Sequence, residues 1–160
     1  MKKHFYLLIV SLLTLNSCSD DIVNTEIPEE ALIRPIIFLA GASNFNTINT
    51  NEISIENIGI VKDVLIVDAT YPGGCGIHST ALFSLTGFLE SHPVQLVMKL
   101  IHHSYSDTCS NNISEKFYFD LKSVATMYNL AYQDDSGVVL LNIFDFDSTN
   151  YYSPQPRYVF

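Results

Sequence analysis

Short stretches of alternating apolar and polar residues dominate the chain from residue 52 onward. Each of five segments places every second side chain on one face, at residues 52–61, 63–71, 77–85, 94–102 and 116–121. A period of two residues is typical of half-buried β-strands. Turn-forming residues separate the segments, most clearly the Pro-Gly-Gly at residues 72–74. In 77–85 the apolar face consists of Ile77, Ala81, Phe83 and Leu85.

One segment departs from this alternation and predicts a short helix. Within residues 121–132, apolar and aromatic side chains recur at spacings of three and four, at Leu121, Val124, Tyr128 and Tyr132. We expect residues 34–40 to supply a first strand and residues 138–146 the last strand before the tail. The core of the domain is expected at about 52–146. The tail from 148, with two prolines, is either an added edge strand or a flexible end. About seven short strands with one helical crossover predict an all-β fold, an antiparallel β-sandwich that is Ig-like or related.

The N-terminus has the features of an export signal. Lys2 and Lys3 precede an apolar segment at residues 5–15. This segment is too short to span a bilayer, which needs about 20 apolar residues, but it is typical of a secretory signal peptide. The following "LNSC", residues 15–18, resembles the lipobox of bacterial lipoproteins. The resemblance implies cleavage before Cys18 and a diacylglycerol on its thiol.

Domain organisation and location follow from this start. We expect a signal peptide at 1–17, a lipidated cysteine with an acidic tether at 18–33, and a β-sandwich domain at 34–160. The "SDD" at residues 19–21 resembles the export signal of Bacteroidota lipoproteins displayed on the outer face of the outer membrane; a solvated acidic tether is the alternative. The expected location is the cell envelope, where the protein is an outer-membrane lipoprotein held by its lipid. The domain faces either the periplasm or the cell exterior.

Composition narrows the classes of partner. Hydrophobic residues make up 48% of the 160 residues and charged residues 16%, so the chain can bury a packed core. The formal net charge is −9. Because phosphate binding requires clusters of basic residues, nucleic acid is excluded as an expected partner.

With Cys18 assigned to lipid, Cys75 and Cys109 remain as a pair. In an exported protein the simplest interpretation is a disulfide. The alternative is a metal site, because Cys75-x-x-His78 and the segment containing His102, His103 and Cys109 together offer two thiols and three imidazoles. An oxidising envelope favours the bridge. On that interpretation His102 and His103 are a strand-end pair, one on each side of the sheet.

Catalytic motifs are absent from the sequence: it contains no GxSxG, HExxH, P-loop or dinucleotide fingerprint. We therefore assign no catalytic residue and no cofactor, and expect a non-enzyme. The "DST" at residues 147–149 resembles the O-glycosylation signal of Bacteroidota envelope proteins, which makes Ser148 a candidate glycosylation site.

Four segments together resemble a group of small Bacteroidota lipoproteins: "GGCGIH" (73–78), "PVQLVMKLIHHSYSDTC" (93–109), "SEKFYFDL" (114–121) and "YNLAYQDDSGVVLLNI" (128–143). The resemblance implies a β-sandwich domain with a Cys75–Cys109 bridge and implies no activity. The chain departs from the group at Gly76 and Ile77, where a charged pair is more usual, and in its long aromatic tail.

Two function classes follow. The first is a non-catalytic envelope module that binds a protein or a glycan through loops at one end of the sandwich. Its best candidate surface is the aromatic tail, which contains Tyr151, Tyr152, Tyr158 and Phe160. The alternative is that this tail is an edge strand packed on the sheet. The second class is a metal-dependent or hydrolytic envelope enzyme that uses His78, His102 or Asp107 near the bridge.

Overall fold

The structure is a computed structural model, and it describes residues 26–41, 45, 47–147 and 149–160. The predicted signal peptide, the lipidation site Cys18 and the candidate glycosylation site Ser148 lie outside the described residues. None of the helices in the described part is both long and apolar enough to cross a bilayer.

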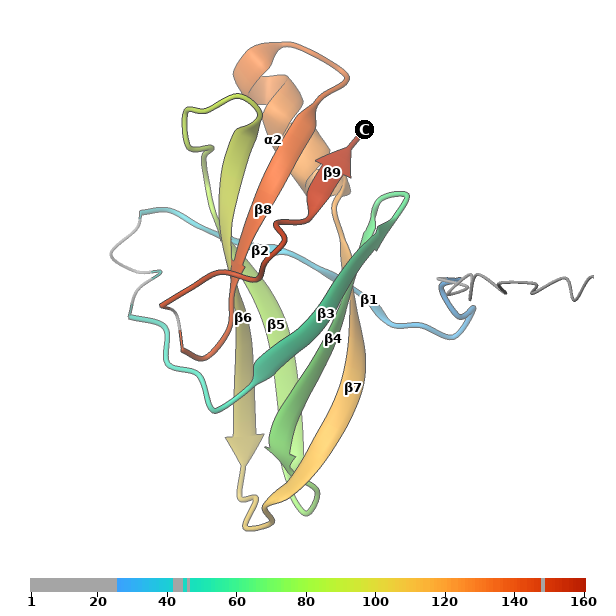
Figure 1. Cartoon of the computed structure of the whole chain (residues 1–160), viewed down its shortest axis with the longest axis vertical. Coiled ribbons are helices and arrows are strands. Elements are labelled where there is room, and N and C mark those ends of the chain that lie inside the picture. Colours follow the sequence, from blue (N-terminus) through green and yellow to red (C-terminus); the bar gives the residue numbers. More distant parts are fainter. Residues whose placement is uncertain (1–25, 42–44, 46, 148) are drawn as a thin grey trace, which may run out of the picture.

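Two sheets form the body of the domain (Figure 1). The first sheet has the strand order β1 (Ile33–Pro35), β7 (Asn111–Asp120), β4 (Val64–Gly73) and β3 (Ser54–Val61). The second has the order β2 (Ile37–Leu39), β5 (Ile77–Leu85), β6 (Val94–Tyr105), β8 (Val138–Phe144) and β9 (Arg157–Val159). The predicted all-β sandwich is confirmed. Its sheets are mixed rather than purely antiparallel, because β1 pairs with β7, β2 with β5, and β6 with β8 in parallel.

The parallel pairs arise where the chain changes sheets. The chain leaves the first sheet at the end of β7, passes through helix α2 (Lys122–Tyr132) at one end of the domain, and enters the second sheet as β8 (Figure 1). Residues 34–40, expected as one strand, form two. Ile36 is buried between β1 and β2, so that this short segment supplies an edge strand to each sheet.

The core lies between the sheets. The predicted inward face of β4 is buried: Leu65, Val67, Ala69 and Tyr71. The prediction for β5 is wrong, because its buried residues are Leu82 and Ser84, whereas Ile77 is 74% exposed. The inward face of β5 begins with a polar residue, His78, whose ring atoms find partners inside the sandwich. A buried polar side chain of this kind breaks the apolar signal from which a strand's inner face is inferred.

The C-terminal tail is an edge strand. β9 pairs with β8, and Tyr158 is fully buried with its hydroxyl donating to Asp63 Oδ1 at 2.9 Å. The Phe160 ring packs against Tyr128 at a centroid distance of 5.3 Å. Two of the four tail aromatics therefore belong to the packed domain, which removes them from the surface that the sequence suggested.

Candidate functional site

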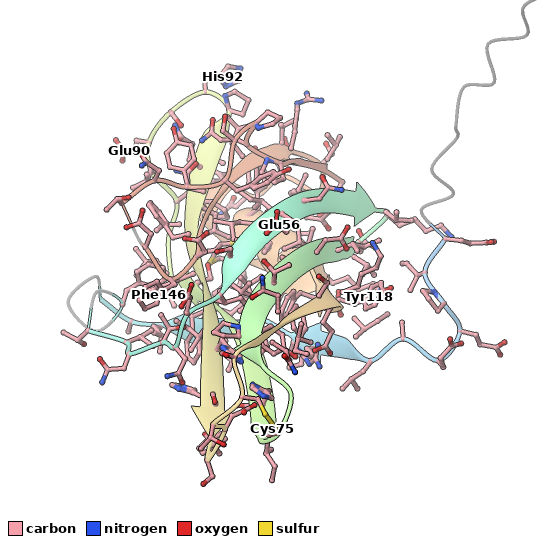
Figure 2. All side chains as sticks on the ribbon, turned by 60° about the horizontal axis from the view of Figure 1, so that its bottom comes forward. Glu56, Cys75, Glu90, His92, Tyr118 and Phe146 are labelled. Atoms are coloured by element: carbon pink, nitrogen blue, oxygen red, sulfur yellow. A yellow bond between two sulfur atoms is a disulfide. The ribbon has the colours of Figure 1, made fainter. Side chains whose placement is uncertain are left out.

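The end of the sandwich opposite α2 carries most of the candidate residues. We call this end the tip; it consists of the turn at residues 74–76 between β4 and β5 and the loop at 106–110 between β6 and β7. Figure 2 shows Cys75 with its disulfide at this end and Glu90 and His92 at the other. The described chain starts at the side of the domain, where Ile27 lines a surface hollow together with Asp63 and Lys122 (Figure 1).

A disulfide joins Cys75 and Cys109 across the tip, with their Cα atoms 5.6 Å apart and a sequence separation of 34. This is the pairing that the sequence favours. One ligand atom from each of Cys75, Asp107 and Cys109 lies within 4.8 Å of the others. Both sulfur atoms are bonded to each other, however, so neither is a thiolate that could hold a metal.

The Asp107 carboxylate binds backbone groups on both sides of the disulfide. Its Oδ2 accepts hydrogen bonds from the N–H groups of Gly74 (2.8 Å) and Cys75 (3.2 Å), and its Oδ1 accepts one from Cys109 (2.7 Å). The side chain is only 2% exposed. The Cys109 N–H is the largest of the causes that hold the pKa of Asp107 well below its usual range, against the opposing effect of burial. Asp107 therefore remains ionised and links the turn to the loop.

The glycines of "GGCG" leave room for this arrangement. A Cβ on Gly73 would lie 2.5 Å from Cε1 of His78 and 2.9 Å from Oδ2 of Asp107. A Cβ on Gly76 would lie 2.6 Å from the Tyr105 carbonyl oxygen. All three distances are shorter than a relaxed carbon contact, so the backbone packs against the site only because these positions have no side chain.

The histidines predicted near the bridge form a hydrogen-bonded chain with Asp107. His78 Nε2 lies 2.7 Å from Asp107 Oδ2, and its Nδ1 lies 2.9 Å from His102 Nε2. His102 Nδ1 lies 3.0 Å from the backbone carbonyl oxygen of Glu52. The two rings are nearly parallel, with an interplanar angle of 4°. We call this series, from the Glu52 carbonyl through His102 and His78 to Asp107, the His–Asp chain.

Tyr71 covers the two rings from β4. Its ring centroid lies 4.4 Å from that of His102 and 5.0 Å from that of His78. Its hydroxyl donates to Glu115 Oε2 at 2.7 Å. Burial, followed by the Glu115 carboxylate, raises the pKa of Tyr71 to about 12. His102 is fully buried, and this burial lowers its pKa.

The structure brings together most, but not all, of the residues singled out from the sequence. The disulfide, His78, His102 and Asp107 meet at the tip. His103 points to the other side of β6, where its ring faces Tyr105 at 6.4 Å. Sequence reasoning missed Tyr71 and Glu115 as members of the site, because strand alternation places Tyr71 inward but cannot show which strand faces it.

The His–Asp chain uses every ring nitrogen that it contains. Both nitrogens of His78 and both of His102 contact protein atoms. A hollow of about 270 Å³ lies beside the chain, lined by Asn51, Glu52, Pro72, His102, Ser104, Asp107 and Cys109. Both imidazoles are thus engaged with other groups of the protein. The geometry supports a structural role for the chain.

An exposed apolar pair lies next to the disulfide. Ile77 at the start of β5 and Tyr105 at the end of β6 are directly paired in the sheet. Their side chains are 74% and 56% exposed. The tip thus combines a fixed backbone with two large side chains that face solvent.

No protein-family model and no curated protein matches the chain. Among solved structures, a NigD-like immunity protein from Bacteroides caccae aligns with a TM-score of 0.57 and 16% identity, over 80% of this chain and 64% of its own. A toxin-related protein from Parabacteroides distasonis aligns with a TM-score of 0.51 and 18% identity, over 79% of this chain and 61% of its own. The chain thus spans less than two thirds of the length of either structure. At these identities the likeness establishes the fold, and the chain shares its sandwich with proteins from Bacteroides and Parabacteroides.

Proposed function

We propose that this protein is a lipid-anchored, non-catalytic binding module of the bacterial cell envelope, and that its tip binds a protein partner. The observation that carries the proposal is the exposed Ile77–Tyr105 pair on a cross-linked end of the domain. Tyrosine beside an aliphatic residue is a frequent anchor of protein interfaces, because it offers a large apolar area and a hydroxyl.

The rigidity of the tip favours binding. The disulfide and the three backbone hydrogen bonds to Asp107 join the turn at 74–76 to the loop at 106–110. A surface that is ordered before binding loses less conformational entropy when a partner docks. A side chain at Gly73 or Gly76 would push these bonded segments apart and change the shape of the tip.

The position of the tip suits a protein held by its N-terminus. The described chain begins at the side of the domain, away from the tip, where Ile27 lines a hollow with Asp63 and Lys122 (Figure 1). A lipid on Cys18, carried by the tether, would attach the domain on that side and leave the tip free for a partner. Two or three acyl chains give stable anchoring, whereas one gives only marginal binding.

Two further observations support a non-catalytic role. Every ring nitrogen of the His–Asp chain is hydrogen-bonded to the protein and both sulfur atoms are in the disulfide, so the groups that the enzyme alternative would use are engaged with other protein atoms. One of the proteins with a similar fold is named as an immunity protein, a name that fits a role in binding rather than in catalysis.

The test compares the two ends of the domain. Ile77→Ser/Tyr105→Ser removes the apolar pair at the tip; Leu130→Ser/Tyr132→Ser is the matched control, since these residues are 77% and 45% exposed on α2 at the other end. We expect crosslinking in intact cells to retain one defined envelope protein with the wild type and the control, and to lose it with the tip variant. Loss of the same protein with both variants, or its retention with both, would contradict the proposal. Capture of a glycan instead would assign the tip to carbohydrate.

The anchor is tested separately. Labelling with radioactive palmitate should mark the wild type and not Cys18→Ser, and protease treatment of unopened cells then distinguishes an exterior from a periplasmic domain. If the wild type were not labelled, the proposed lipid anchor would be refuted. The proposed binding by the tip would still be tested by the crosslinking experiment.

A further inference from the structure

The three hydrogen bonds of the His–Asp chain require one proton more than two neutral histidines carry. A carbonyl oxygen only accepts hydrogen bonds, so His102 Nδ1 must carry a proton toward Glu52. The Asp107 carboxylate already accepts three backbone N–H bonds, so it is ionised and His78 Nε2 must carry a proton toward it. A hydrogen bond across the 2.9 Å between His78 Nδ1 and His102 Nε2 requires a third proton. Two neutral imidazoles supply only two such protons.

We propose that the His–Asp chain is a proton-dependent clamp: the two imidazoles jointly hold one extra proton, balanced by the Asp107 charge, and this proton closes the tip. Removing it leaves two protons for three contacts, so one hydrogen bond of the chain is lost. Adding another proton places N–H groups face to face between His78 and His102, and that contact becomes repulsive. The clamp is closed only in the singly charged state.

The neighbouring groups favour this state. Burial lowers the pKa of His102, and His78 is the ring in direct contact with the carboxylate. We therefore place the extra proton on His78. A buried ion pair is tolerated when its remaining hydrogen-bonding groups are satisfied. Here the carboxylate has three backbone donors, and the imidazolium has His102 as the acceptor for its second proton.

The other titratable groups that face the chain do not replace Asp107. From β4, Tyr71 packs on both rings and stays neutral below its raised pKa of about 12. From β7, Glu115 accepts the Tyr71 hydroxyl. From β6, His103 lies on the opposite face of the strand, beside Tyr105. Glu52 contributes its backbone carbonyl, and both cysteines are in the disulfide.

The clamp connects four parts of the chain: the segment before β3 through Glu52, β6 through His102, β5 through His78, and the β6–β7 loop through Asp107. Its opening therefore separates the His78 side chain from either His102 or Asp107, while the backbone pairing of β5 with β6 remains. This inference goes beyond the proposed function, because the proton count and its effect on stability need no partner and are tested without one.

The first experiment counts the protons directly on the wild type. Long-range ¹H–¹⁵N NMR of the ¹⁵N-labelled full chain in detergent distinguishes protonated from unprotonated ring nitrogens. At pH 6.5 we expect three of the four nitrogens of His78 and His102 to be protonated, with His102 Nε2 as the acceptor. Two protonated nitrogens, one on each ring, would overturn the proposal, and so would four.

The second experiment measures how stability depends on pH. Free histidine titrates near pH 6.5. Above this value the folded chain holds a proton that the unfolded chain has released, so stability falls as the pH rises; below it the unfolded chain binds one proton more than the folded chain, so stability falls as the pH drops. Each one-proton difference changes the unfolding equilibrium constant by up to about tenfold per pH unit.

The matched variants are His78→Gln, which cannot hold the proton, and His92→Gln, which alters an exposed histidine at the other end of the domain. Urea unfolding of the full chain between pH 5 and 9 should show stability falling above pH 6.5 for the wild type and for His92→Gln but not for His78→Gln, whereas the fall below pH 6.5, which the buried His102 causes, should remain in all three. The same profile in all three proteins would overturn the clamp. Should His78→Gln fail to fold, the ring-nitrogen spectra of the wild type decide the question alone.

Discussion

Removing the Cys75–Cys109 disulfide tests how much of the stability comes from cross-linking the tip. The bridge spans 34 residues. In the chain-entropy model, opening a loop of this length gives the unfolded chain freedom worth about 4 kcal/mol at 25 °C. Cys75→Ser/Cys109→Ser should therefore lower the free energy of unfolding by about 4 kcal/mol. This is a large part of the roughly 5–15 kcal/mol that stabilises an ordinary domain.

The effect should appear mainly in the unfolded state. The three hydrogen bonds to Asp107 use backbone N–H groups, so the serine variant retains every donor at the tip. For a domain of this size about 1 kcal/mol shifts Tm by roughly 3–4 °C, which predicts a fall of about 12–16 °C. Circular dichroism melts and urea titrations of the oxidised wild type, the reduced wild type and the double variant measure it.

The reduced wild type is the internal comparison, since it lacks the bridge but keeps both cysteines. Its melting temperature should match that of the double variant to within a few degrees, and reductant should leave the double variant unchanged. If the double variant melted within about 3 °C of the oxidised wild type, the unfolded chain would already be restricted without the bridge, and the loop-entropy argument would be refuted.

Three further predictions follow from single contacts. Gly73→Ala should cost about 2–3 kcal/mol in urea unfolding, because the added carbon would lie 2.5 Å from the nearest histidine ring atom; a cost below about 0.5 kcal/mol would show that the ring can move aside. Tyr158→Phe should cost about 1.5–3 kcal/mol, because it leaves the Asp63 carboxylate without a buried donor, whereas Tyr152→Phe, whose hydroxyl makes an exposed contact, should change stability by less than about 0.5 kcal/mol; equal effects would contradict the argument from burial. The pKa of Asp107 is lowered in the folded state, so its contribution is present above about pH 4 and is lost as the pH falls below that value; Asp107→Asn should remove this part of the acid unfolding curve, and an unchanged curve would assign the acid sensitivity to other carboxyl groups.

Alternation alone predicts the strands well where one face is wholly apolar. On β4 the inward residues are hydrophobic and the buried face matches the pattern, whereas β6 is buried on both faces from Met98 to His102. The helix is predicted by its spacing of three and four, and the two cysteines are paired once Cys18 is assigned to lipid. Periodicity and residue counts contain this information because each depends on local sequence.

The features that the sequence does not reveal depend on contacts between distant segments. The inner face of β5 carries His78, and its burial is intelligible only after His102 and Asp107 are known to meet it. The division of residues 34–40 into two strands depends on Ile36 reaching the core between two sheets. The parallel pairing of β6 with β8 depends on α2 crossing one end of the domain. None of these contacts leaves a periodic signal in the segment that it shapes.

The split of the first strand also determines how the domain responds to mechanical load. The chain enters through β1, on the edge of the first sheet, and passes at once through Ile36 to β2, on the edge of the second. Tension on an N-terminal anchor would first load the short β1–β7 pairing, and the buried Ile36 would then transmit the force to both layers. The tip lies at the other end of β7 and is cross-linked separately. A pull that strips β1 from its sheet would thus reach the tip last, because β1 pairs with the end of β7 that lies away from the tip.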